Sequence, residues 1–233
     1  MLSPGSLPFT REQFIHVFAD YNHAIWPMQV FAYLLGVIMI VALARAPRVP
    51  CVTNNKTNYL IGFGLALMWV WAGVAYHGLF FSTINTAAFF FAALFVLQAL
   101  LLTYFTARRR LEFATGDGIS RGIGWALIVY ALLIYPLAGI LSGNRYPEMP
   151  MFGTTPCPVT IFTVGLFVLA KPRVPRALLV IPFLWSLLGG SAVFVLGVAQ
   201  DWPLLFCVFA IPFIVIRDRK KSRLSIMQKG IST

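Results

Sequence analysis

Residues 86–105 set the class of fold, because they read TAAFFFAALFVLQALLLTYF and contain no charged side chain. An α-helix needs about 20 predominantly apolar residues to cross the roughly 30 Å hydrocarbon core of a bilayer. Arg108–Arg110 follow closely, and basic residues in this position are typical of the ends of membrane-spanning helices. The stretch therefore predicts a transmembrane helix.

Six other stretches share this apolar character. Together with Thr86–Phe105 they make seven predicted spans, namely Pro27–Ala44, Tyr59–Phe81, Thr86–Phe105, Gly122–Leu141, Pro156–Ala170, Ala177–Ala199 and Trp202–Ile216. Of the 233 residues, 59% are hydrophobic and 11% are charged, whereas soluble domains carry about 25% charged residues. This composition excludes a soluble enzyme, a disordered chain and a disulfide-built secreted module. We therefore predict an all-α polytopic membrane protein with about seven transmembrane helices.

The basic residues predict an orientation. With these spans, sixteen Lys and Arg residues fall in the loops of one side and in the C-terminal tail, and only Arg11 and Arg145 fall on the other side. The positive-inside rule then puts the N-terminus outside and the C-terminus inside. The net charge of +11 comes mainly from basic residues that keep their loops on the inner side of the membrane and face anionic lipid. We therefore expect no nucleic-acid partner. The expected partners are the lipid bilayer, anionic lipid at the basic inner face and, as one alternative, further copies of this chain.

A separate helix is predicted before the first span. Thr10-Arg11-Glu12-Gln13 has the pattern of a capping box, and apolar residues follow at helical spacing as far as Tyr21. The predicted organisation is an outer amphipathic surface helix (1–26), a seven-helix transmembrane domain (27–216) and a basic cytoplasmic tail (217–233).

Potential metal ligands gather at the outer end of this topology. His16, Asp20 and His23 share one stripe of the surface helix, His77 ends the second span, and Cys157 precedes the fifth. Nitrogen, oxygen and sulfur ligands suit a transition metal ion such as zinc, copper or mercury. One hypothesis is a metal site made of these five residues. The alternative is that His16 and His23 face water and that Cys157 is an inert buried thiol.

The loop before the fifth span is unusual. Residues 142–158 read SGNRYPEMPMFGTTPCP, in which four prolines fix the path of the backbone. A regular helix beginning after Pro158 would span only about 18 Å. We therefore expect residues 153–158 to enter the outer leaflet and line a cavity, with free N–H groups at 159–161. The alternative is an outer loop above a tilted helix. The candidate substrate-binding residues are Arg145, Tyr146, Glu148, Thr155 and Asn85.

Four motifs carry a resemblance to a known family. They are FTREQF at 9–14, GVAYHG at 73–78, RYPEMPMFG at 145–153 and PCPVTIFT at 156–163. With these motifs the chain resembles an uncharacterised family of bacterial multi-pass membrane proteins, a domain of unknown function. The resemblance implies a multi-pass protein of the bacterial inner (cytoplasmic) membrane and implies no activity.

The function favoured by these observations is transport or binding of a metal ion or small solute at an outer-facing cavity. The alternatives are a membrane-embedded enzyme, as a metal-dependent hydrolase or oxidoreductase, and an accessory subunit of a membrane complex. The sequence contains no known catalytic motif and no phosphate-binding loop of the GxxxxGK[ST] type, so it assigns no catalytic residue.

Overall fold

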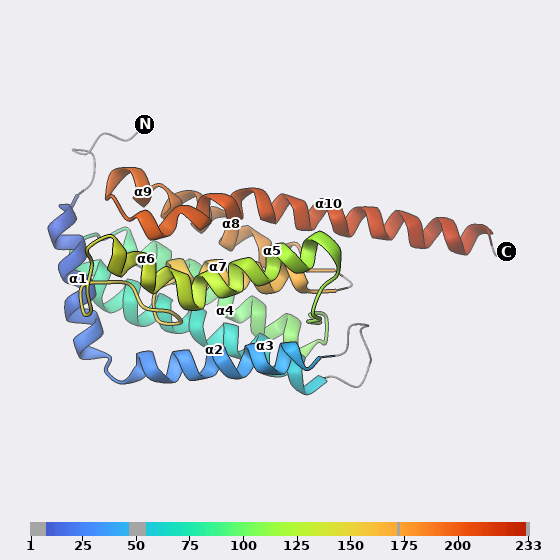
Figure 1. The fold of residues 1–233 in the computed structure, drawn as a ribbon, viewed down its shortest axis with the longest axis horizontal. Coiled ribbons are helices and arrows are strands. Elements are labelled where there is room, and N and C mark those ends of the chain that lie inside the picture. Colours follow the sequence, from blue (N-terminus) through green and yellow to red (C-terminus); the bar gives the residue numbers. More distant parts are fainter. Residues whose placement is uncertain (1–7, 47–54, 172, 232–233) are drawn as a thin grey trace.

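A computed structural model describes residues 8–46, 55–171 and 173–231, with the backbone alone for Asn55 and 220–231. These residues form helices and connections, and no strand occurs among them. The helices are α1 (Arg11–Ala24), α2 (Met28–Ala44), α3 (Asn55–Trp71), η1 (Ala72–Phe80), η2 (Phe81–Thr83), α4 (Ala88–Ala107), α5 (Gly118–Val129), η3 (Tyr130–Ile134), α6 (Tyr135–Leu141), α7 (Pro156–Leu169), α8 (Ala177–Gly190), α9 (Ala192–Val195), η4 (Ala199–Asp201) and α10 (Trp202–Ile231). The long helices run along one axis, and α1 lies across one end of the bundle (Figure 1).

Five helical segments among the described residues are long and apolar enough to cross a membrane. They are Lys56–Thr83, Ala88–Ala107, Gly118–Leu141, Ala177–Val195 and Ala199–Arg219. The pair α1 and α2, bent by 85°, makes a sixth if it counts as one span, and α7 is a shorter apolar helix. All seven predicted spans are therefore helical in large part. The count of seven transmembrane helices and the orientation stay predictions, because α2 has 17 residues and α7 has only 14.

The outward faces of the long helices are apolar. Large exposed side chains include Phe31 of α2, Phe90 and Leu100 of α4 and Phe209 of α10, each more than half exposed. Soluble monomers rarely expose apolar surface on this scale. The exposure agrees with helices that face lipid.

The short helix α7 lies in the middle of the bundle. Every residue from Pro158 to Leu169 is buried, and the indole N–H of Trp69 donates to the Thr163 hydroxyl at 2.9 Å. A side-chain atom added at Gly165 would lie 2.9 Å from the carbonyl oxygen of Gly124, so α5 and α7 pack with their backbones close together. Because α7 is surrounded by protein, its length need not match the thickness of the bilayer.

The helix α1 begins with the predicted capping box. The Gln13 N–H donates to the Thr10 hydroxyl at 3.2 Å, and the Thr10 N–H donates to the Gln13 side chain at 2.8 Å. Its apolar stripe, with Val17, Phe18 and Tyr21, packs onto the end of the bundle. At the other end of the chain, α10 continues unbroken from Trp202 to Ile231, so the predicted tail boundary at 217 is not a break in the helix.

Candidate functional site

A cavity of about 220 Å³ lies beneath α1. Phe14 and Phe18 of α1 close one side of it, and the other walls come from η1, the start of α7, α8 and the segment from α9 to η4. Most of its lining is aromatic or aliphatic. Its polar groups belong chiefly to Tyr76, His77, Asn85, Tyr135, Thr155, Cys157, Ser191 and Asp201.

His77 is the most unusual of these groups. Its imidazole is fully buried, and among the described residues neither ring nitrogen has a hydrogen-bond partner. Five aromatic rings surround it, with centroids at 4.9 to 5.9 Å; they belong to Tyr76, Phe81, Phe91, Phe95 and Trp185. His77 lies in η1, which is wound as a π-helix, and such insertions are rare and frequent at functional sites.

A second polar group forms around Asp201. The Tyr135 hydroxyl donates to the Asp201 carboxyl at 2.5 Å, and the Cys157 thiol lies against the same carboxyl. Tyr135 directly follows the π-helical turn η3, and the Tyr130 hydroxyl on that turn donates to the Gln200 carbonyl at 3.0 Å. Two π-helical segments therefore position polar groups at this cavity.

The second half of the loop before α7, residues 149–155, is largely buried and is held by α1. Phe152 and Thr155 are fully buried, and the Tyr21 hydroxyl donates to the Thr154 carbonyl at 2.6 Å while it accepts from the Trp71 indole at 2.9 Å. Burial raises the pKa of the Tyr21 hydroxyl, so it remains a donor at neutral pH. The polar side chains of α1 thus fix the loop that lines the cavity.

The fifth helix begins where its predicted span begins, and the expectation of free N–H groups at 159–161 is not met at Val159. The helix α7 begins at Pro156 and not after Pro158, because proline is tolerated in the first turn, where no backbone donor is needed. The Val159 N–H therefore donates to the Thr155 carbonyl at 3.4 Å and is not free to face the cavity.

A model of a family of unknown function, DUF6064, matches residues 11–225. The chain belongs to this family. No curated protein and no solved structure matches the chain. Membership in DUF6064 confirms the resemblance to an uncharacterised family and brings no activity with it.

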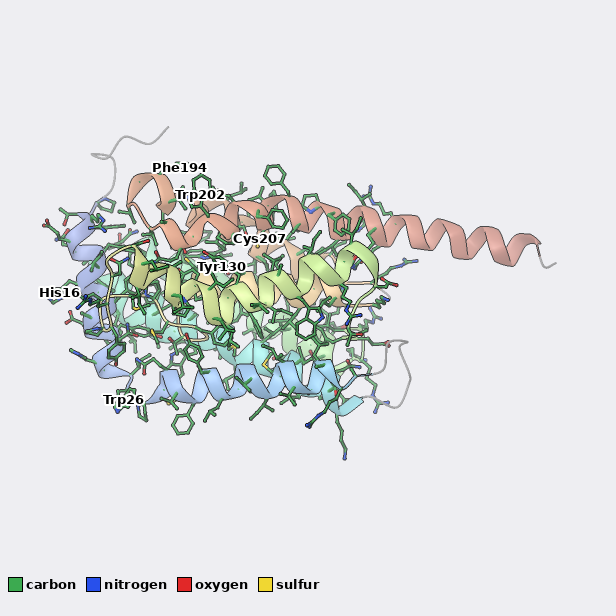
Figure 2. The ribbon with its side chains drawn as sticks, viewed as in Figure 1. His16, Trp26, Tyr130, Phe194, Trp202 and Cys207 are labelled. Atoms are coloured by element: carbon green, nitrogen blue, oxygen red, sulfur yellow. The ribbon has the colours of Figure 1, made fainter. Side chains whose placement is uncertain are left out.

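The predicted metal ligands of this DUF6064 chain lie in two places. His77 and Cys157 line the cavity, whereas His16 and Asp20 lie on the exposed face of α1, 3.3 Å apart, and His23 is exposed as well (Figure 2). The apolar stripe of α1 takes the inward side, so the polar stripe faces away from the bundle. The described residues contain no group of three or more His, Cys, Asp or Glu that could hold a metal ion.

The predicted substrate-binding residues of the DUF6064 chain are also divided. Asn85 and Thr155 line the cavity, whereas Arg145, Tyr146 and Glu148 are exposed on the loop. That loop turns Met149 and Phe152 inward and leaves its charged residues Arg145 and Glu148 outside.

Sequence reasoning did not select Asp201, Tyr135 or Trp185 as site residues. In the sequence, Asp201 directly precedes a predicted span, and nothing distinguishes it there from any other acidic residue at a membrane surface. Its pairing with Tyr135, 66 positions away, has no signal in a single sequence.

Proposed function

We propose that this protein binds a small, mostly apolar organic molecule in the cavity beneath α1, with a hydrogen-bonding group of the ligand at His77. The two ring nitrogens of His77, which have no partner among the described residues, carry this proposal. Leaving a buried polar group without a partner costs about 1–3 kcal/mol. A ligand that bonds to the imidazole recovers that energy.

The lining supports this ligand chemistry. Aromatic side chains such as Phe18, Phe91 and Trp185 suit a flat or aliphatic body, and neutral imidazole offers both a donor and an acceptor. The carboxyl of Asp201, bonded to Tyr135, offers a second polar contact. A molecule with a hydroxyl or carbonyl group on an apolar frame fits this set of contacts.

The surroundings of the cavity support entry from the bilayer. Leu188 lines the cavity and is 51% exposed on the outward face of α8, beside the exposed Leu187. An apolar ligand dissolved in lipid would meet this rim first. The proposal covers binding alone, and no metal cargo is part of it.

The proposal includes an orientation in which the end with α1 faces outside and the basic end faces the cytoplasm of a bacterial inner membrane. The positive-inside rule supports it. Because successive helices run in alternating directions, the connection at 108–117 and residues 173–176 before α8 lie at the end away from α1 (Figure 1).

Replacing His77 with phenylalanine is expected to remove the preference of the protein for a hydroxylated ligand. The probes are 1-naphthol and naphthalene, which differ by one hydroxyl group, and binding is followed by quenching of tryptophan fluorescence in detergent. The wild type is expected to bind 1-naphthol about five- to tenfold more tightly, since one buried hydrogen bond contributes about 1 kcal/mol. His77→Phe is expected to bind both probes equally.

The matched control is His16→Phe, because His16 is exposed on the far face of α1. This variant is expected to keep the wild-type preference. Equal binding of the two probes by the wild type, or a preference retained by His77→Phe, would contradict the proposed role of His77.

A further inference from the structure

A second pocket, of about 410 Å³, lies at the end of the bundle away from α1. It is formed by the end of α4, the connection before α8 and the part of α10 near Val215. Five arginines line it, namely Arg109, Arg110, Arg173, Arg176 and Arg219. Phe105, Leu179 and Val215 supply an apolar wall beside them. The pocket therefore combines concentrated positive charge with carbon surface.

Within the described part of the chain, most of these arginines have no side-chain partner. Among the described residues, the guanidinium groups of Arg110, Arg173, Arg176 and Arg219 make no hydrogen bond or ion pair with another side chain. The two acidic residues of the pocket are Glu112 and Asp218, and Asp218 already accepts from Arg217 and from the Val174 N–H. By contrast, Lys171 at the same end is paired with Asp117 at 2.8 Å.

The backbone of Arg109 gives a second, independent observation. Its φ is 53°, and it is the one non-glycine residue with positive φ in the described part of the chain. The N–H groups of Arg109 and Arg110 donate to the carbonyls of Thr106 and Phe105, both at 2.9 Å, which is the hydrogen-bond pattern that usually places glycine at this position. The chain carries an arginine where glycine would be less strained. Its Nε donates to the Tyr59 hydroxyl at 2.9 Å, which orients the side chain.

We infer that this arginine-lined pocket binds a phosphate group, as carried by the headgroup of an anionic lipid. Guanidinium groups form paired hydrogen bonds with phosphate oxygens, and a bound phosphate would offset the repulsion among five like charges. Basic pockets between membrane helices are suited to phospholipid headgroups. The apolar wall of Phe105, Leu179 and Val215 would lie beside the acyl chains. The site is separate from the cavity beneath α1 and does not depend on the ligand proposed there.

Native mass spectrometry of the full chain in a neutral detergent tests this inference. The probes are phosphatidic acid and diacylglycerol with the same acyl chains, which differ by the phosphate alone. We expect phosphatidic acid to bind about tenfold more tightly than diacylglycerol, and we expect added salt to weaken the binding of phosphatidic acid. The double variant Arg173→Gln/Arg176→Gln is expected to lose this advantage, whereas Arg121→Gln, at the same end but outside the pocket, is expected to keep it.

Arg109→Gly separates binding from folding. Glycine relieves the positive φ, so the variant is expected to melt no lower than the wild type while its affinity for phosphatidic acid falls. Competition with inorganic phosphate distinguishes a soluble phosphate compound from a lipid headgroup as the natural ligand. Displacement of phosphatidic acid by millimolar phosphate indicates a soluble compound, and no displacement indicates a lipid. Equal binding of phosphatidic acid and diacylglycerol, or equal losses in Arg121→Gln and the double variant, would overturn the inference.

Discussion

Adding one methyl group at Gly165 is expected to destabilise the protein by about 1–3 kcal/mol, as overpacking does in tightly packed interiors. The new atom would lie 2.9 Å from the Gly124 carbonyl oxygen and 3.0 Å from Cγ1 of Ile128. The first of these neighbours belongs to the backbone of α5, which cannot rotate away as a side chain can. Gly165→Ala would therefore push α5 and α7 apart along the most buried helix of the bundle.

Thermal unfolding in detergent, followed by circular dichroism, measures this effect. For a chain of this size, 1 kcal/mol corresponds to about 2–4 °C in the melting temperature. Gly122→Ala is the matched control on α5, because nothing lies within 4 Å of its added atom. A Gly165→Ala protein that melts with the wild type, or an equal loss in Gly122→Ala, would show that the helices are not packed this closely.

The close packing of α5 and α7 also affects the cavity, because α7 carries part of its lining. The first turn of α7 carries Cys157, and Thr155 precedes it, so any shift of α7 along α5 moves part of the lining. The same substitution is expected to weaken ligand binding beneath α1. The stability of the core and the shape of the site are thus linked through one short helix.

Local patterns predicted much of the fold. The capping box at Thr10 was confirmed because its two hydrogen bonds join residues only three positions apart. The apolar stretches became helices because hydrophobic length is a property of each segment alone. His77 was selected because an ionisable residue within a span indicates function. These signals need no knowledge of neighbouring helices.

What the sequence did not predict depends on contacts between distant segments. The pairing of Asp201 with Tyr135 needs the relative placement of η4 and α6, and the π-helical turns that orient His77 and Tyr135 leave no periodic pattern in the residues. The five-residue metal hypothesis requires the polar stripe of α1 to face inward, whereas its alternative leaves His16 and His23 facing water. The helix instead buries Val17 and Phe18, which is the side that its apolar residues require.

Replacing Asn22 with leucine is expected to have the second large effect, on both stability and binding. The side-chain amide of this fully buried residue donates to the carbonyls of Pro147 and Met149, at 2.7 and 2.8 Å. Leucine has a similar size and no donor, so both carbonyls would lose a partner, at about 1–3 kcal/mol for each that stays buried. The loop that continues to Pro150 and Thr155 would loosen, and both of these residues line the cavity.

We expect Asn22→Leu to melt several degrees lower and to bind 1-naphthol about tenfold more weakly, the loss that corresponds to 1.4 kcal/mol. Amide hydrogen exchange should increase more in residues 147–155 than in α7. The loop loses its hydrogen bonds to Asn22, whereas the helix keeps its own backbone hydrogen bonds. His23→Leu is the matched control: it places the same side chain at the next position, which is exposed. If both variants lose the same stability, the effect comes from added apolar surface on α1. If Asn22→Leu binds 1-naphthol as the wild type does, the loop does not shape the cavity and α1 serves only to cover it.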